Sequence, residues 1–156
     1  MKKMTQLGLV AAALALSATA FAGTCPADKV GENTLANAPT MPTGVSEKEI
    51  ASIDLATENV KLDNRRLRLR HMTIQPGGIV PLHSHADRPA LIMVNSGEVF
   101  ENSSKCMVPI LHKAGEVSKE FLGTMHWWKN STKKAVELTI SDIVNDKKPE
   151  TMMQMM

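Results

Sequence analysis

Apolar and polar positions alternate along short stretches of the chain, and turns rich in glycine separate these stretches. Because alternate side chains of an extended strand point to the same face, this period of two predicts half-buried β-strands. Short strands separated by turns at intervals of about 8–12 residues are typical of an all-β barrel or sandwich. The pattern predicts one β domain over residues 50–145, with a turn at 75–78. Its predicted strands are 66–74, 79–85, 91–94, 98–101, 107–111, 116–118, 126–130 and 136–143.

Two flanking segments lack this alternation. Residues 23–49 contain three prolines among several Gly, Asn and Thr residues, so we predict an irregular N-terminal arm. Ser46 and Glu49 have the spacing of a helix capping box, whereas the apolar run that follows fits a helix or a strand. Residues 146–156 end in Met-Met-Gln-Met-Met, which predicts a disordered tail, with a thioether site for Cu(I) as the alternative.

Residues 1–22 have the features of a secretory signal peptide. Two lysines precede an apolar run over 7–16, and Ala20-Phe21-Ala22 places small residues where a signal peptidase cleaves. We therefore expect cleavage after Ala22 and a periplasmic or secreted location. A lipid-anchored protein has a small residue just before the cysteine that carries the lipid, whereas Thr24 precedes Cys25 here. We therefore expect no membrane anchoring of the mature chain.

The charge balance excludes one class of partner. The chain has 18 Lys and Arg against 16 Asp and Glu, and two of the lysines leave with the signal peptide. The mature chain is thus formally neutral, and a broad basic surface for nucleic acid is not expected. Leu67 and Leu69 alternate with a group of arginines, which predicts a strand with a solvated basic face. The arginines are Arg65, Arg66, Arg68 and Arg70.

The two cysteines are predicted to pair. Export implies an oxidising compartment, and a Cys25–Cys106 disulfide would join the arm to the barrel. The alternative is that Cys106 is a free thiol near the functional site.

Three histidines are the candidate metal ligands. His83 and His85 are separated by one residue, which places both imidazoles on one face of a strand. His126 lies about forty residues further on, and a second strand can bring it to the same point. Imidazole nitrogen is a good ligand for zinc, copper, iron and nickel.

The glycines around these histidines have a spacing that resembles the two motifs of the cupin family. In the first motif, five residues separate Gly77 from His83-Ser84-His85, and Gly97 closes it. The second motif matches at Gly115, Gly123, His126 and Asn130. Ala90 stands where cupins carry a glutamate, and Phe121 stands where they carry a proline. The resemblance implies a jelly-roll barrel, the double-stranded β-helix of that family.

Cupins usually bind a metal ion through three histidines and the glutamate. The resemblance thus implies one divalent transition metal (Fe, Mn, Zn, Cu or Ni) on His83, His85 and His126, without the carboxylate that Ala90 replaces. The implied activity is metal-assisted oxygenation, isomerisation or lyase action on a small organic molecule. The alternatives are a non-catalytic protein that binds a small ligand or copper, and a metal-free barrel. Because cupins commonly dimerise through their sheets, a homodimer is also expected.

Strand parity predicts which residues lie beside the metal. Trp128 shares a strand face with His126 and is expected to line the cavity, whereas Trp127 faces away. Arg88 follows the first two histidines and is expected either to line the pocket beside an anionic ligand or to form a structural ion pair. No residue is assigned a catalytic role. Five other residues are interpreted as surface or structural positions: His71, Asp87, Glu98, Glu101 and His112.

Overall fold

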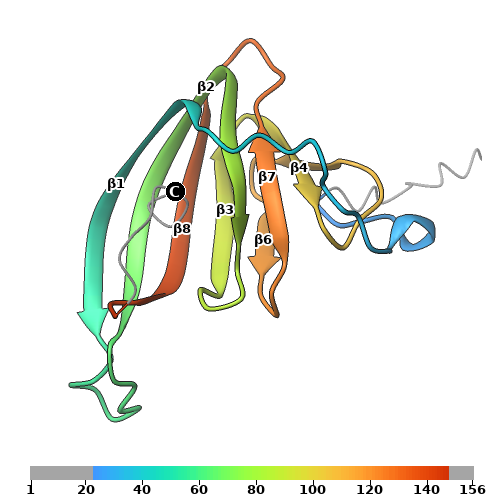
Figure 1. Ribbon diagram of the computed structural model, residues 1–156. Coiled ribbons are helices and arrows are strands. Elements are labelled where there is room, and N and C mark those ends of the chain that lie inside the picture. The colour runs from blue at the N-terminus through green and yellow to red at the C-terminus, as the bar shows by residue number, and fades with distance from the viewer. Residues whose placement is uncertain (1–22, 148–156) are drawn as a thin grey trace, which may run out of the picture.

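A computed structural model describes residues 23–147. The predicted signal peptide and the methionine-rich end of the chain lie outside these residues. Eight antiparallel strands form a nearly closed barrel, which confirms the predicted all-β fold (Figure 1). They are β1 (Thr43–Asp54), β2 (Arg65–Ser84), β3 (Ala90–Ser96), β4 (Glu98–Ser103), β5 (Ile110–Lys113), β6 (Val117–Glu120), β7 (Met125–Lys129) and β8 (Val136–Asn145).

The strands follow the spatial order β5-β4-β7-β2-β8-β3-β6, and β1 pairs with β2. The first half of β2 lies between β1 and β8, while its second half pairs with β7. One strand therefore connects the two sides of the barrel. No helix in the described part of the chain has the length and apolar character needed to cross a membrane.

The turn predicted at 75–78 is absent, because β2 continues through it for 20 residues. Opposite this stretch the register of β1 and β2 shifts, since Val45 pairs with Ile74 and Thr43 with Ile79. Gly77 adopts a φ of 76°, which glycine tolerates without strain. The Pro-Gly-Gly sequence thus forms an irregularity that bends the strand instead of reversing the chain.

The predicted arm extends too far, because β1 begins at Thr43 and not after residue 49. Ser46 and Glu49 lie within this strand and cap no helix. Pairing with β2 from Val45 to Asp54 supplies the strand conformation that the local sequence leaves open. Before β1, the arm is irregular apart from the short 3-10 helix η1 (Ala27–Lys29).

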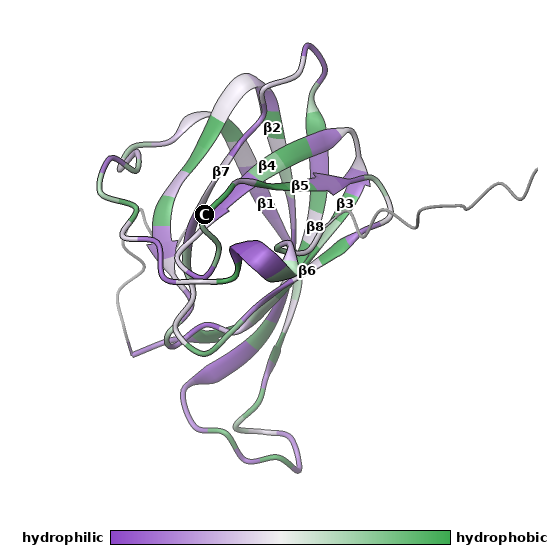
Figure 2. Cartoon of the chain, turned by 90° about the vertical axis from the view of Figure 1, so that its right-hand side faces the viewer, coloured by the Kyte–Doolittle hydropathy of each residue, from purple (hydrophilic) through white to green (hydrophobic). Residues whose placement is uncertain are grey.

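Inward-facing aliphatic residues of four strands and one tryptophan fill the barrel. Hydrophobic and hydrophilic residues alternate along the strands that surround this core (Figure 2). Its buried members include Met72, Ile74, Val80, Ile92, Val94, Val99, Trp128, Val136, Leu138 and Ile140.

The solvated basic face predicted for the first long strand is wrong for two of its arginines. Arg68 and Arg70 are 4% and 3% exposed, while the alternating Leu67 and Leu69 point outward and are each 37% exposed. Arg68 donates two hydrogen bonds to the carboxylate of Asp142, both of 3.0 Å, and Arg70 pairs with the same carboxylate and with Glu47. Buried charge is tolerated here because it is paired.

The predicted disulfide between Cys25 and Cys106 is confirmed, with Cα atoms 5.7 Å apart. The alternative of a free thiol at Cys106 is therefore wrong. A β-bridge between Val30 and Cys106 adds a second attachment of the arm. The arm is thus fixed against the connection between β4 and β5.

Replacing Asp142 by asparagine should destabilise the barrel by about 3–5 kcal/mol at neutral pH, because Arg68 and Arg70 lose their buried counter-charge. Burial opposes ionisation of Asp142, but the hydrogen bonds from Arg68 and the nearby arginine charges hold its pKa below the ordinary value of 3.8. Its stabilising effect is therefore complete above the unfolded pKa and is lost as pH falls through the folded pKa.

Urea unfolding followed by tryptophan fluorescence measures both effects. Between about pH 5 and about pH 3, the Asp142→Asn variant should lose less stability than the wild type. Asp146→Asn, which removes the exposed partner of Arg66, is the control and should change stability by less than about 1 kcal/mol. Equal effects of the two substitutions would contradict the assignment.

Removing the disulfide by the double substitution Cys25→Ser and Cys106→Ser should lower the free energy of unfolding by about 3–5 kcal/mol. The bond joins residues 81 positions apart, so it restricts the unfolded chain strongly. Denaturant unfolding of the oxidised wild type and the variant provides the measurement. The expectation fails if both unfold at the same midpoint.

Candidate metal centre

The three histidines come together on paired strands. His83 lies opposite His126 in the register of β2 and β7. His85 immediately follows β2, and its backbone N–H donates to the carbonyl of Thr124 at 2.8 Å. Their exposed fractions of 5%, 2% and 0% place all three imidazoles inside the barrel.

A β-bulge turns the first two histidines inward. Even-numbered residues of β2, such as Arg70 and Met72, face the interior before the bulge, whereas His83 and His85 face it afterwards. Three steps along β2 from Val80 to His83 match two steps along β7, from Trp128 to His126. The extra residue changes the parity of the strand, which is how bulges redirect side chains.

The Nε2 atoms of the three rings meet at one point. The Nε2 of His126 is 2.9 Å from that of His83 and 3.0 Å from that of His85. Three nitrogens this close, all screened from water, require a proton or a cation among them.

The opposite nitrogens of His83 and His85 are bonded to backbone carbonyls. Nδ1 of His83 lies 2.9 Å from the oxygen of Pro81, and Nδ1 of His85 lies 2.6 Å from that of Arg88. Because a carbonyl oxygen only accepts, each Nδ1 carries the hydrogen and each Nε2 presents its lone pair. Metal-binding histidines usually have such a partner, which fixes the ring orientation.

Two buried carboxylates face the other nitrogen of His126. Glu101 and Glu120 each have an oxygen 3.3 Å from Nδ1. The indole N–H of Trp128 also approaches this nitrogen, at 3.0 Å. Charged hydrogen bonds are about twice as strong as neutral ones, so we assign the Nδ1 hydrogen to the carboxylates.

The three imidazoles differ in their affinity for protons. Burial and the neighbouring histidines lower the pKa of His83 well below its ordinary value, and lower that of His85 to about 3. Burial also opposes protonation of His126, but Glu120 and Glu101 outweigh it and raise its pKa to about 9. Without a metal ion, the positive charge of the cluster therefore resides on His126.

The donor set fits a divalent first-row metal ion. Two nitrogens bonded to one ion at about 2.0–2.1 Å and at right angles lie about 2.9 Å apart. The observed spacings of 2.9 and 3.0 Å match this arrangement. Three imidazoles leave further coordination positions open for water or another small ligand.

The carboxylates that sequence reasoning missed lie behind His126. Ala90 is buried and offers no ligand, whereas Glu101 and Glu120 are only 3% and 2% exposed. The interpretation of Glu101 as a surface residue is thus wrong. Val99, Glu101 and Ser103 alternate inward along β4, so strand parity was the signal that could have identified Glu101. Ser118 donates to Glu120 at 2.5 Å and fixes its position.

His112 supports this outer layer. Its Nε2 lies 2.7 Å from Glu101, and its ring stacks on Trp128 with centroids 4.9 Å apart. Burial raises the pKa of Glu101, but the hydrogen bonds from His112 and His126 dominate and lower it to about 2. Glu101 is therefore an anion at neutral pH.

The cavity beside the histidines has a volume of only about 20 Å³. Trp128 lines it, as parity predicts, together with Arg70. Arg88 is not among the lining residues. It is buried, with its guanidinium 3.7 Å from Asp142, so the structural ion pair is the better interpretation of its role.

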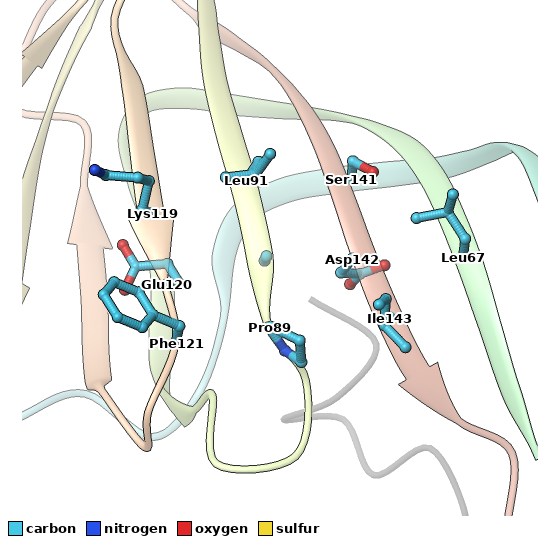
Figure 3. A pocket seen from close by; sticks show the side chains of 10 residues that line it. Leu67, Pro89, Leu91, Lys119, Glu120, Phe121, Ser141, Asp142 and Ile143 are labelled. Carbon is cyan, nitrogen blue, oxygen red and sulfur yellow. The ribbon is translucent and has the colours of Figure 1, made fainter. Parts of the chain in front are cut away.

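A wider hollow of about 430 Å³ lies on the outer face of the sheet (Figure 3). Apolar side chains such as Leu91, Phe121 and Ile143 border it. None of the three histidines lines it. The space around the metal centre and the hollow on the surface are therefore separate.

No family model and no curated protein matches the sequence. Solved structures match the fold. A predicted oxalate decarboxylase from Thermotoga maritima aligns with a TM-score of 0.54 and 18% identity, over 78% of this chain and 98% of that one. The Cnp3 cupin domain of Schizosaccharomyces pombe gives 0.51 and 13%, over 67% of each chain. KdgF from Halomonas sp. gives 0.51 and 13%, over 67% of this chain and 83% of that one.

This chain has the cupin fold. The expectation drawn from the glycine-spaced histidines is thereby confirmed at the level of architecture. The low identities extend the likeness no further than the fold and assign no chemistry to this chain.

Neutralising the carboxylate behind His126 should weaken metal binding. We expect Glu101→Gln to lower the affinity for a divalent ion about 10–100-fold, as is usual when the partner of a metal-binding histidine is removed. Competition with a chromophoric chelator measures the affinity. Glu98→Gln, on the exposed side of the same strand, is the control and should leave the affinity unchanged.

Proposed function

We propose that this chain is an exported cupin-fold protein that binds one divalent transition-metal ion through His83, His85 and His126. The observation that carries the proposal is the convergence of three buried Nε2 atoms whose partner nitrogens are bonded to oxygen acceptors. Such preorganisation favours metal binding because little ordering remains to be done when the ion arrives.

The charge around the site supports the same proposal. An ion on three neutral imidazoles keeps its full positive charge, which is unfavourable inside a barrel. Glu101 and Glu120 lie on the far side of His126 and supply negative charge there. Their negative charge replaces that of the glutamate which cupins carry at the position of Ala90.

The size of the cavity supports a role in holding the ion. A volume of about 20 Å³ accommodates about one water molecule, whereas pockets for organic ligands usually exceed about 300 Å³. Bound there, the ion would polarise a coordinated water and lower its pKa.

The second candidate is metal-assisted conversion of a small organic anion, by oxygenation, isomerisation or lyase action. The open coordination positions of a three-histidine site favour it, and the predicted oxalate decarboxylase that shares the fold suggests the substrate class. This activity requires the cavity to widen, so turnover of oxalate by the metal-loaded protein would favour it. A copper site in the methionine-rich tail falls outside the described residues.

Export rests on two features. The N-terminal sequence has the features of a signal peptide, and the Cys25–Cys106 bond is stable in an oxidising compartment. We therefore propose a periplasmic or secreted location.

Elemental analysis of protein recovered from the exported fraction tests the metal site. We expect about one equivalent of a first-row metal per chain in the wild type, and a loss of at least tenfold in His83→Ala and His126→Ala, since each removes a ligand. His71→Ala, at an exposed position on β2, is the control and should retain the metal. The proposal is wrong if the wild type neither contains a metal nor binds one when titrated with Fe, Mn, Zn, Cu or Ni ions.

A further inference from the structure

The first described residue is bound against the barrel. The backbone N–H of Gly23 donates to the carbonyl of Leu111 on β5 at 2.9 Å. Two residues later, the Cys25–Cys106 disulfide attaches the same segment to the loop before β5. Gly23 also borders a surface hollow of about 200 Å³ that has Glu101 and Glu120 in its wall. This end of the arm therefore has a defined position next to the outer layer of the metal centre.

His112 lacks one hydrogen-bond partner at this position. Its side chain is 1% exposed, and its Nε2 bonds to the Glu101 carboxylate, which only accepts. Nε2 therefore carries the hydrogen, and Nδ1 is left as an acceptor. Among residues 23–147, nothing donates to this Nδ1. Buried polar atoms without a partner are uncommon and unfavourable, so a donor is expected.

The geometry around Gly23 shows where such a donor can come from. A fourth substituent on its α-carbon, at the position of a Cβ atom, would lie 3.0 Å from Glu116 Oε2 and 3.4 Å from His112 Nδ1. These are close contacts for a carbon atom and hydrogen-bonding distances for a nitrogen. A free amino group can reach this position by rotation about the bond between the α-carbon and the carbonyl carbon, which exchanges its hydrogen bond to Leu111 for Glu116 and His112.

We propose that cleavage after Ala22 creates an α-ammonium group on Gly23 that binds between Glu116 and His112. Water hydrolyses the Ala22–Gly23 peptide bond, the new carboxylate leaves with residues 1–22, and the released amine takes up a proton. The ammonium then donates to the Glu116 carboxylate and to His112 Nδ1. This inference rests on the proposed export of the chain.

The bound ammonium would complete a hydrogen-bonded chain to the metal centre. It fixes the Nε2–H form of His112, whose hydrogen bond to Glu101 measures 2.7 Å. Glu101 in turn contacts His126 at 3.3 Å. The amine that cleavage releases on Gly23 thus orients His112 and Glu101. Gly23 is a positioning residue, because its amine does not contact the ion.

Reactivity of the α-amine tests the inference. The processed protein, recovered from the exported fraction, is treated near pH 7 with a small amine-reactive ester, and labelling of the N-terminal peptide is followed by mass spectrometry. We expect a mature chain that begins at Gly23 and an α-amine that reacts about tenfold more slowly than in Glu116→Gln, because pairing with a carboxylate raises the pKa of an amine that otherwise titrates near 8. A serine inserted before Gly23, which displaces the amine, should give the same acceleration. Glu98→Gln is the control and should react like the wild type.

Two outcomes would overturn the inference: a mature chain that begins elsewhere, or equal labelling rates in the wild type and Glu116→Gln. Metal content, measured on the same samples, reports the three-histidine site separately. A protected α-amine in a protein without metal would support the amine site and contradict only the proposed metal function.

Discussion

The contact of His126 with two buried carboxylates is the constraint on which the centre of the barrel depends. Glu101 and Glu120 are only 3% and 2% exposed, so negative charge on them requires a positive charge close by. His126 provides it through one ring nitrogen and presents the other to His83 and His85. Occupancy of the cluster by a cation and stability of the fold are therefore linked, since whatever binds only the folded chain stabilises it.

Local rules predicted much of this protein, and long-range pairing decided the rest. The His-x-His pair and the inward position of Trp128 depend on strand parity, which a sequence displays directly. Arg68 was assigned to the surface because it alternates with Leu67 and Leu69, and leucine is more often buried than arginine. Its partner Asp142 lies 74 residues away, and no local pattern connects them. The first part of β1 was assigned to the arm and its end was left open between a helix and a strand for the same reason, because pairing with β2 and not its own alternation makes it a strand.

The substitution at Ala90 moves negative charge instead of abolishing it. In the usual cupin arrangement a carboxylate contacts the ion, whereas here the carboxylates contact His126, one of the proposed ligands. Charge at this greater distance still offsets the cation, but it occupies no coordination position. The proposed centre thus combines three imidazoles with an anionic surrounding, in a space of about 20 Å³ that would admit little besides an ion and water.

The bulge between Val80 and His83 also bears on which insertions and deletions this barrel can accept. It acts as a phase shift against β7, since Val80 pairs with Trp128 before it and His83 pairs with His126 after it. Removing one residue there would leave the His-x-His motif intact in the sequence and turn both imidazoles to the outer face of the barrel. A descendant of this chain can therefore preserve every histidine and glycine and still lose the centre. The length between Val80 and His83 is as much a part of the site as its ligands.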